Sequence, residues 1–388
     1  MLNFDFYNPT RIIFGKDRLE TIDAFVPAEA AVLITYGGGS AKRSGLIDKV
    51  KAVLRDRKVY EFGGIESNPR YETLLKAVEV VRTESIDFIL AVGGGSVIDG
   101  TKFISLAASY AGEASDLFKF GFMLVPLDVV GKAVPFGTVL TIPATGSEVN
   151  FAAVISYGHG KYLVNSELIF PKFSILDPVI TFTLPKIQVA NGVVDAFVHT
   201  IEQYLTFPAD ARVQDRMAEG ILQTLIEIGA ATVAEPENYD VRANHVWAAT
   251  TAMMGVIGAG VPQDWTSHMI GHELTALFGI DHGQTLAIVL PSLLTERRQQ
   301  KRAKLLQYAE RVWHIESGSE DEKIDLAIAK TRDFFESLGV KTRLSEYGVG
   351  ADKIPVVVEQ LKAHGLTALS ETGDLTLDIS RKILEGAM

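Results

Sequence analysis

Four residues in the second half of the chain have side chains that could together hold a divalent metal ion. Asp195 and His199 are four residues apart in an apolar segment, so on a helix they project from one face. His268 and His282 add two further imidazoles, and the chain has only 8 histidines. One carboxylate and three imidazoles can bind a divalent metal without any cysteine. We therefore expect a metal site formed by these four residues.

The ligand types favour iron or zinc. Mg²⁺ and Ca²⁺ prefer oxygen-rich sites, whereas imidazole suits Fe²⁺ and Zn²⁺. Four protein ligands would close a tetrahedral zinc site, but catalysis needs an open position. Fe²⁺ with five or six ligands leaves that position, and zinc could do so through a fifth one. Both metals remain candidates.

A further histidine follows one helical turn after His268. His272 has the same four-residue spacing from His268 that His199 has from Asp195. A histidine beside a metal ligand is a candidate proton relay in catalysis. It can equally be a residue that only supports the metal ligands, and both interpretations stay open.

Two glycine clusters directly follow β-rich runs in the first half of the chain. The first contains Gly37, Gly38, Gly39 and Ser40, and the second runs from residue 93 to Ser96. Glycine lets backbone N–H groups approach a phosphate closely, and a helix that begins just behind the loop adds a favourable dipole. Each loop alone could be a plain tight turn. Two such loops in one alternating domain favour nucleotide binding.

The first glycine cluster also indicates which nucleotide would bind. The usual dinucleotide fingerprint requires glycine where Lys42 and Ile98 stand, and no P-loop motif occurs. NAD enzymes place an acidic residue near the ribose 2′-hydroxyl, but this chain offers glycines, Ser40, Lys42 and Arg43. Cations without a carboxylate suit a 2′-phosphate. We therefore predict NADP(H) as the cofactor in preference to NAD.

The order of the predicted elements indicates two domains. Short β-rich runs alternate with helical patterns up to about residue 180, which is typical of a Rossmann-like parallel sheet. We predict an α/β dinucleotide-binding domain over 1–180 and an all-helical metal-binding domain over 181–388. The predicted strands are 31–36, 58–62, 88–92, 138–142 and 173–176. The predicted helices include one after Pro69 and those at 212–229, 241–257, 301–313 and 323–338.

Composition narrows the possible partners and location. The formal net charge of −11 argues against nucleic acid as the main partner, because phosphate neutralisation needs clustered Lys and Arg. The absence of cysteine excludes disulfides and thiolate metal sites. The N-terminus lacks a basic region followed by an apolar run, and no stretch of 18 apolar residues is present. We expect a cytoplasmic protein with no membrane partner.

Several motifs together resemble the iron-containing (group III) alcohol dehydrogenase family. They are VVDAFVHTIEQY, the His268-x-x-x-His272 segment, Asp281-His282-Gly283 and GGGSVID from residue 93. The match covers essentially the whole chain, and the motifs in this order are highly specific. The resemblance implies a dehydroquinate synthase-like α/β domain followed by a helical domain.

The resemblance also assigns roles to single residues. Asp195, His199, His268 and His282 match the family's metal ligands. The residues matched to the cofactor site are Asn68, Gly94, Gly95, Ser96, Asp99, Thr141, Ser147 and Lys161. The segment from Thr141 reads TIPATGSE, which departs from the commoner TTAGTGSE. Gly37 stands where NAD-preferring relatives carry Asp, which agrees with the NADP(H) prediction.

The function implied by the resemblance is interconversion of aldehydes and primary alcohols over a broad substrate range, with aldehyde reduction expected in the cell. The family also implies a homodimer formed through the N-terminal segment FYNPTRIIFG. One rival is a lyase resembling 3-dehydroquinate synthase, which needs several basic residues around a phosphorylated substrate. The segment 193–282 contains few of them.

Two other rival functions have less support. A metal hydrolase is disfavoured because the pattern His-Glu-x-x-His fails at Ala276. A nucleotide-binding module without enzymatic activity would leave Asp195 and the three histidines without a role.

Overall fold

The computed structural model describes residues 1–388, which form two compact units. One unit is Tyr7–Thr183, and the other combines Met1–Phe6 with Leu184–Met388. The first unit is α/β and the second is almost entirely helical, so the predicted fold class is confirmed. Residues 1–6 were expected in the first domain but group with the helical unit. There the N–H of Leu2 donates to the carbonyl of Gly260 at 2.8 Å.

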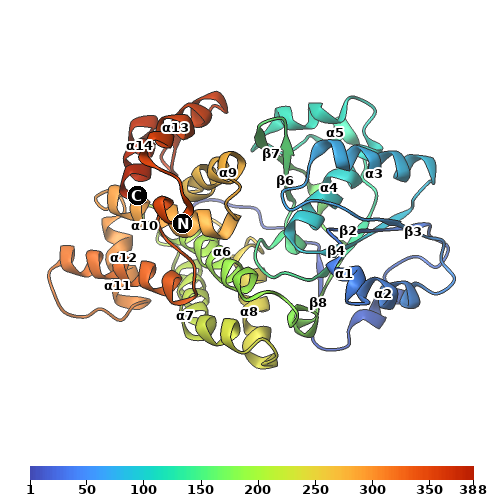
Figure 1. The fold of residues 1–388 in the computed structure, drawn as a ribbon, viewed down its shortest axis with the longest axis horizontal. Helices are drawn as coiled ribbons and strands as arrows, with labels where there is room; N and C mark the ends of the chain where they lie inside the picture. Colours follow the sequence, from blue (N-terminus) through green and yellow to red (C-terminus); the bar gives the residue numbers. More distant parts are fainter. The chain divides into compact units, whose positions relative to one another are not determined.

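Six parallel strands form the sheet of the α/β unit, in the order β1-β8-β5-β4-β2-β3. The four inner strands are buried along their whole length, as expected for a parallel sheet covered on both faces. Figure 1 shows α3 and α4 on one face and α2 on the other. The strands are β1 Arg11–Phe14, β2 Val32–Tyr36, β3 Val59–Phe62, β4 Phe88–Gly93, β5 Phe136–Leu140 and β8 Phe173–Leu176.

Helices and a hairpin complete this unit. The antiparallel hairpin is β6 Ala152–Tyr157 with β7 Gly160–Asn165. The α-helices are α1 Ser40–Arg43, α2 Leu46–Leu54, α3 Tyr71–Thr83, α4 Gly95–Ser109 and α5 Leu127–Val130. Short 3-10 helices lie at Leu19–Ala24, Ala114–Phe120, Ser147–Val149, Glu167–Ile169 and Pro178–Thr181.

The strand order reverses between β2 and β4. Strand β3 adds to one side of β2, and the chain then crosses back to place β4 on the other side, with β5 beyond it. Open α/β sheets bind ligands outside the carboxyl ends of their strands at such a reversal. The two glycine clusters follow β2 and β4. The topology therefore brings both clusters to the expected ligand-binding edge.

The predictions for β2, β3, β4 and β8 agree with the structure to within one residue, whereas β5 is shifted, and β1 and the hairpin strands β6 and β7 were not predicted. Strand β5 begins and ends two residues before the predicted run 138–142. Pro143 lacks an N–H, and Thr141 already donates its N–H to Gly93 beyond the end of the strand. Strand β1 was not predicted, because it has only four residues and lies at the sheet edge with mixed exposure.

The second unit is built from nine α-helices and a pair of two-residue strands. Helix α6 packs against α7, α8, α9 and α10, and Figure 1 shows it running through the middle of this unit. The helices are α6 Lys186–Tyr204, α7 Arg212–Ala234, α8 Tyr239–Ala252, α9 Thr266–Phe278, α10 His282–Glu296, α11 Arg302–Arg311, α12 Glu320–Ser337, α13 Ile354–Ala363 and α14 Leu377–Gly386. The strands are β9 Ala368–Leu369 and β10 Leu375–Thr376, and 3-10 helices lie at Leu344–Tyr347 and Ala351–Lys353.

Helix boundaries follow local breaks that the apolar pattern does not reveal. The predicted helix 241–257 is α8, which ends at Ala252. Gly255 adopts a positive φ of 92°, a left-handed conformation that ends a helical run. Helix α7 continues past Gly229 to Ala234. These differences do not move any residue of the predicted metal site.

Helix α7 is the one helix whose length and composition would also allow it to cross a membrane. A third of its most apolar window is buried inside the unit, where α7 packs against α6 and α8. A core helix of a globular protein passes the same test. This one helix is therefore weak evidence for a membrane span.

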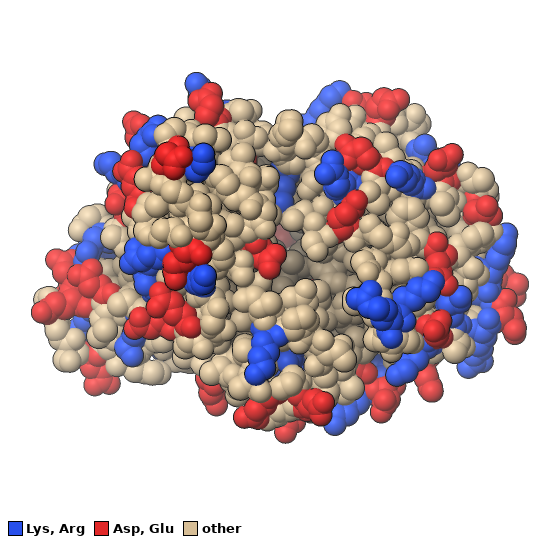
Figure 2. Space-filling model, in the orientation of Figure 1, with Lys and Arg blue, Asp and Glu red and all other residues tan.

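Charged side chains of both signs are interspersed on the visible surface. Figure 2 shows Lys and Arg beside Asp and Glu over both units on the face drawn. This mixture accompanies the net charge of −11.

Candidate metal centre and cofactor loops

Helix α6 positions the first two predicted metal ligands. Asp195 and His199 are four residues apart on one face, and both are buried in the helical unit. The Nδ1 atom of His199 lies 3.6 Å from Oδ1 of Asp195. Apolar residues on the other faces of α6 pack into the core, so the orientation of this pair is set by core packing.

Helices α9 and α10 bring the other two histidines to the same carboxylate. His268 lies in the first turn of α9, and His282 is the first residue of α10. Gly279 ends α9 with a positive φ of 68°, which allows the tight turn into α10. The Nε2 atoms of His268 and His282 each lie 3.7 Å from Oδ1 of Asp195.

The spacing of these atoms fits a shared ion. Two ligands that bind one Fe²⁺ or Zn²⁺ at about 2.1 Å lie at most ~4.2 Å apart. Each of the three imidazoles meets this limit with Asp195. The tightest group is Asp195, His268 and His282, whose donor atoms lie within 4.8 Å of one another. His199 lies outside this group: its Nδ1 is 3.6 Å from Oδ1 of Asp195, and its ring stacks on that of His268 with a centroid distance of 4.5 Å.

Three of the converging atoms are buried without a hydrogen-bond partner. They are Oδ1 of Asp195, Nδ1 of His199 and Nε2 of His268. Their separations of 3.6 and 3.7 Å exceed a hydrogen bond. Leaving such groups unsatisfied costs about 1–3 kcal/mol each. A divalent cation between them would satisfy all three, so the residues present fit the expected metal.

The protonation of the two inner histidines differs. The pKa of His199 is lowered to about 4, chiefly by burial; the charge of Asp195 opposes this shift, and the charge of His268 adds to it. His199 is therefore neutral at pH 7, as a metal ligand must be. Burial also acts to lower the pKa of His268, but Glu202 and Asp195 outweigh it and raise that pKa to about 9. A metal must displace a proton from His268, so we expect metal affinity to fall as the pH falls.

Glu202 belongs to this site but was not predicted. It lies on α6, and its carboxylate is hydrogen-bonded to Nδ1 of His268. Its position seven residues after Asp195 places it on the same helix face. That spacing was the one sequence signal that could have identified it.

His272 lies beside the cluster without joining it. Its ring centroid is 5.1 Å from that of His282 and 6.3 Å from that of His268. The side chain is partly exposed, whereas His268 is buried. This position is compatible with a proton relay.

The second glycine cluster packs tightly against the protein itself. A side-chain Cβ atom on Gly94 would lie 2.9 Å from Cβ of Ile142, and one on Gly95 would lie 2.3 Å from Oγ1 of Thr145. Close packing therefore requires glycine at these positions even without a ligand. The support for phosphate binding comes instead from helix α4, whose 15 residues begin at Gly95.

The first glycine cluster gives a different result. Gly39 needs glycine because its φ is 90°, but a Cβ on Gly38 would meet no atom within 4 Å. The space beside Gly38 is open, as a ligand site requires. Helix α1 behind this cluster has only four residues, so the expected helix dipole is weak here.

Lys42 and Arg43, the two cations that follow this cluster, have different interaction partners. Nζ of Lys42 pairs with Glu61 at 3.0 Å, and the pKa of Glu61 is lowered to about 2 by Lys51 and Lys42. Arg43 reaches back to the cluster, where its Nη1 donates to the carbonyl of Gly38 at 3.3 Å. Arg43 is therefore better placed than Lys42 to meet a 2′-phosphate.

Most of the other predicted cofactor residues gather beyond β4 and β5. The N–H of Asn68 donates to Oγ of Ser96 at 3.2 Å. Asp99 accepts a hydrogen bond from Oγ of Ser147 at 2.5 Å, and burial raises the pKa of Asp99. The positive charge of Lys161 acts on the same carboxylate.

Thr141 lies in the same region. It directly follows β5, and its N–H donates to Gly93 at 3.0 Å. The residues predicted to bind the cofactor therefore come together at the edge of the sheet where its strand order reverses.

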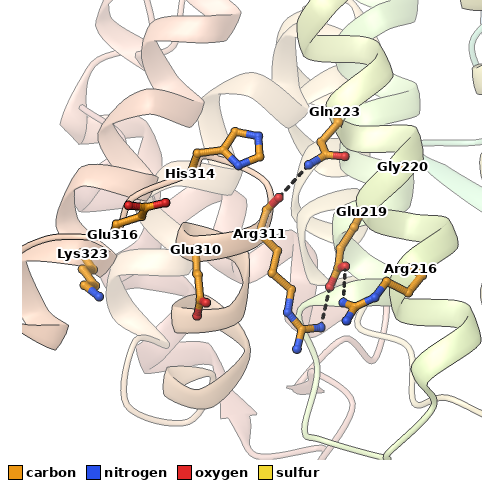
Figure 3. Close-up of a pocket in the computed structure, with 9 residues that line it drawn as sticks. All are labelled: Arg216, Glu219, Gly220, Gln223, Glu310, Arg311, His314, Glu316 and Lys323. Atoms are coloured by element: carbon orange, nitrogen blue, oxygen red, sulfur yellow. Dashed lines mark hydrogen bonds and ion pairs between the residues drawn. The ribbon is translucent and has the colours of Figure 1, made fainter.

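A surface pocket of about 700 Å³ lies elsewhere in the helical unit (Figure 3). Both Arg216 and Arg311 pair with Glu219, at 2.8 and 3.1 Å. Besides His314, the pocket is lined by three basic side chains and three carboxylates. Its charge therefore does not favour a ligand of either sign. It contains none of the predicted site residues. Its lining residues are Arg216, Glu219, Gly220, Gln223, Glu310, Arg311, His314, Glu316 and Lys323.

Two family models match the chain. Residues 9–178 match the model for iron-containing alcohol dehydrogenase, and residues 189–369 match the C-terminal model of the Fe-containing alcohol dehydrogenase family. The chain therefore belongs to the iron-containing alcohol dehydrogenase family, and the resemblance seen in its motifs is confirmed.

Individual relatives agree with this assignment. The chain is 57% identical to the NADPH-dependent aldehyde reductase YqhD of Escherichia coli strain K12, and the match covers 100% of both chains. The crystal structure of E. coli YqhD matches with a TM-score of 0.97 and covers 100% of this chain and 99% of that one. A probable NADH-dependent butanol dehydrogenase of Bacillus subtilis is 41% identical over 94% of this chain and 95% of its own length.

Removing either inner histidine should release the metal. We expect His199→Ala and His268→Ala each to weaken Zn²⁺ binding at least ~100-fold, because residues outside the ligand set already change affinity by about 10–100-fold. Metal content after dialysis and competition with a chelator would measure this. His159→Ala, an exposed histidine of the α/β unit, is the control and should bind metal normally. Unchanged affinity in both site variants would contradict the assignment.

Proposed function

We propose that this chain is an NADP(H)-dependent and metal-dependent oxidoreductase that reduces aldehydes to primary alcohols and catalyses the reverse reaction. The observation that carries the proposal is that a ring nitrogen of each of His199, His268 and His282 lies 3.6–3.7 Å from Oδ1 of the buried Asp195. Family membership and the full-length likeness to an aldehyde reductase support it. The same findings do not favour the lyase resembling 3-dehydroquinate synthase.

The helical unit would provide the metal ion for this reaction. A bound Fe²⁺ or Zn²⁺ would supply Lewis-acid stabilisation of a carbonyl oxygen, and NADPH would supply the hydride. Asp195, His199, His268 and His282 would hold the metal. The first three are at most 6% exposed, so they keep water from the inner side of the site.

The α/β unit would hold the cofactor. We propose that the glycine cluster at 93–95 and Ser96 bind the pyrophosphate at the start of α4. Asn68, Asp99, Thr141, Ser147 and Lys161 would line the adjoining cofactor site. Gly37, Gly38, Gly39 and Ser40 would accept the ribose 2′-phosphate, with Arg43 supplying positive charge.

A direct assay tests the proposed activity. Metal-replete protein should oxidise NADPH with butanal, and a short panel of aldehydes should give similar efficiencies, because one methylene changes binding in an apolar pocket by only about 1–3 kcal/mol. Loss of NADPH absorbance measures the rate. A chelator should abolish it, and Fe²⁺ or Zn²⁺ should restore it. No turnover by metal-replete protein would instead favour a lyase or a binding protein.

Cofactor preference should depend on Gly37. We expect higher kcat/KM with NADPH than with NADH, and Gly37→Asp should reduce that ratio at least ~10-fold, because a carboxylate repels the 2′-phosphate. A Cβ at Gly37 would lie 3.2 Å from the Ile65 carbonyl, so a small shift accommodates the side chain. Gly37→Ala controls for that shift. Equal efficiency of the wild type with both cofactors would contradict the preference.

His272 is proposed as the proton relay. If it moves the proton, His272→Ala should lower kcat by about 10²–10⁴-fold and change the pH dependence of the rate, since general acid catalysis contributes that much. Metal content should stay at the wild-type level. An unchanged rate and pH profile would remove His272 from the mechanism.

The remaining parts of the proposal concern assembly and location. Phe6, Tyr7 and Phe14 are 45%, 63% and 37% exposed, which supports a homodimer formed through the segment FYNPTRIIFG. Sedimentation velocity would test it, and a monomer at all concentrations would contradict it.

We also propose a cytoplasmic protein whose partners are small aldehydes and alcohols, with neither nucleic acid nor membrane. Cell fractionation tests the location.

A further inference from the structure

Glu202 contacts His268 on the side opposite Asp195. Its side chain is 1% exposed, and one carboxylate oxygen is hydrogen-bonded to Nδ1 of His268. The other oxygen accepts from the N–H groups of Ser267 at 2.6 Å and of His268 at 3.3 Å. One buried carboxylate thus binds both the ring and the backbone of a predicted metal ligand.

This contact determines which ring nitrogen of His268 is available. An ionised carboxylate only accepts hydrogen bonds, so Nδ1 of His268 must carry the proton. In a neutral imidazole the lone pair is then on Nε2. That atom lies 3.7 Å from Oδ1 of Asp195, on the metal side of the ring.

The same carboxylate stabilises the first turn of α9. The first N–H groups of a helix have no partner within the helix, and the N-cap residue Trp265 provides no side-chain cap. Glu202 satisfies Ser267 and His268, and Asp264 accepts from the N–H of Thr266 at 3.0 Å. A residue of α6 therefore fixes both the ring of His268 and the helix turn that carries it.

A buried lysine compensates for this concentration of negative charge. Nζ of Lys301 lies 2.8 Å from Asp264 and 3.0 Å from Glu371, and it donates to the carbonyl of Leu205 at 2.7 Å. The side chain of Lys301 is 2% exposed. Leu205 directly follows α6, and Asp264 directly precedes the N-cap of α9, so Lys301 ties together the ends of the two helices that Glu202 connects.

We propose that Glu202 is a positioning residue of the metal centre, which holds His268 in the Nδ1–H tautomer with Nε2 directed at the ion. Outer carboxylates that orient metal-binding histidines in this way are a general feature of metalloproteins. The proposal rests on the proposed metal centre. It assigns Glu202 no contact with substrate or cofactor.

The first test is metal affinity in Glu202→Gln. Glutamine has the same shape, but its NH₂ group would face either Nδ1 of His268 or the N–H groups of α9, and both arrangements lose hydrogen bonds. We expect the Kd for Zn²⁺ to rise about 10–100-fold, as for other residues that support metal ligands. Competition with a fluorescent chelator would measure it in the full-length protein.

The matched control is Glu219→Gln. Glu219 is also a buried carboxylate, on α7, and it pairs with Arg216 and Arg311 away from the metal residues. This variant should lose stability but keep the wild-type Kd for Zn²⁺. If Glu219→Gln weakened Zn²⁺ binding as much as Glu202→Gln, general destabilisation would explain both effects and the proposal would be wrong.

A second measurement does not require the variant to fold. Nitrogen NMR of ¹⁵N-histidine in the zinc-loaded wild type should show His268 with a protonated Nδ1 and a metal-bound Nε2. A metal-bound or unprotonated Nδ1 would overturn the proposal, as would unchanged Zn²⁺ affinity in folded Glu202→Gln. Failure of the wild type to bind any metal would instead refute the proposed function.

Discussion

In the helical unit, three histidines surround the buried carboxylate of Asp195. Oδ1 of Asp195 lies 3.6–3.7 Å from an imidazole nitrogen of each of His199, His268 and His282. These distances are too long for hydrogen bonds and suit ligands of one ion. Buried donors and acceptors without partners are costly, so a divalent cation would stabilise the packing of three helices as well as provide chemistry. Metal binding and the stability of this unit are therefore linked.

The precision of the site comes from elements that are rigid for other reasons. Helix α6 is fixed by the apolar core around it, and the start of α9 is fixed by Glu202 and Asp264. In the α/β unit, the reversal of strand order between β2 and β4 brings two glycine clusters to one edge. Both sites thus follow from packing and topology, with side chains supplying specificity.

Features that depend on residues close together in the sequence could be predicted. The α/β and helical halves follow from periodicity, and the pair Asp195 and His199 follows from helical spacing. The grouping of Asp195 with His268 and His282 was expected from residue type and family motifs, but no pattern predicted the contact between Glu202 and His268, which are 66 positions apart. Similarly, the glycines at 94 and 95 indicated a phosphate loop, yet packing against Ile142 and Thr145 requires them in any case. The ion pair between Lys42 and Glu61 also could not be predicted from the residues next to the glycine cluster.

We propose that Asp195, His199, His268 and His282 bind one catalytic metal. Anomalous X-ray diffraction above and below the iron and zinc absorption edges tests it most directly, on crystals of active protein purified anaerobically without added metal. We predict a single anomalous peak per chain in contact with all four side chains, with the edge identifying the native metal. A peak at another position, or no peak in crystals that reduce aldehydes, would contradict the account.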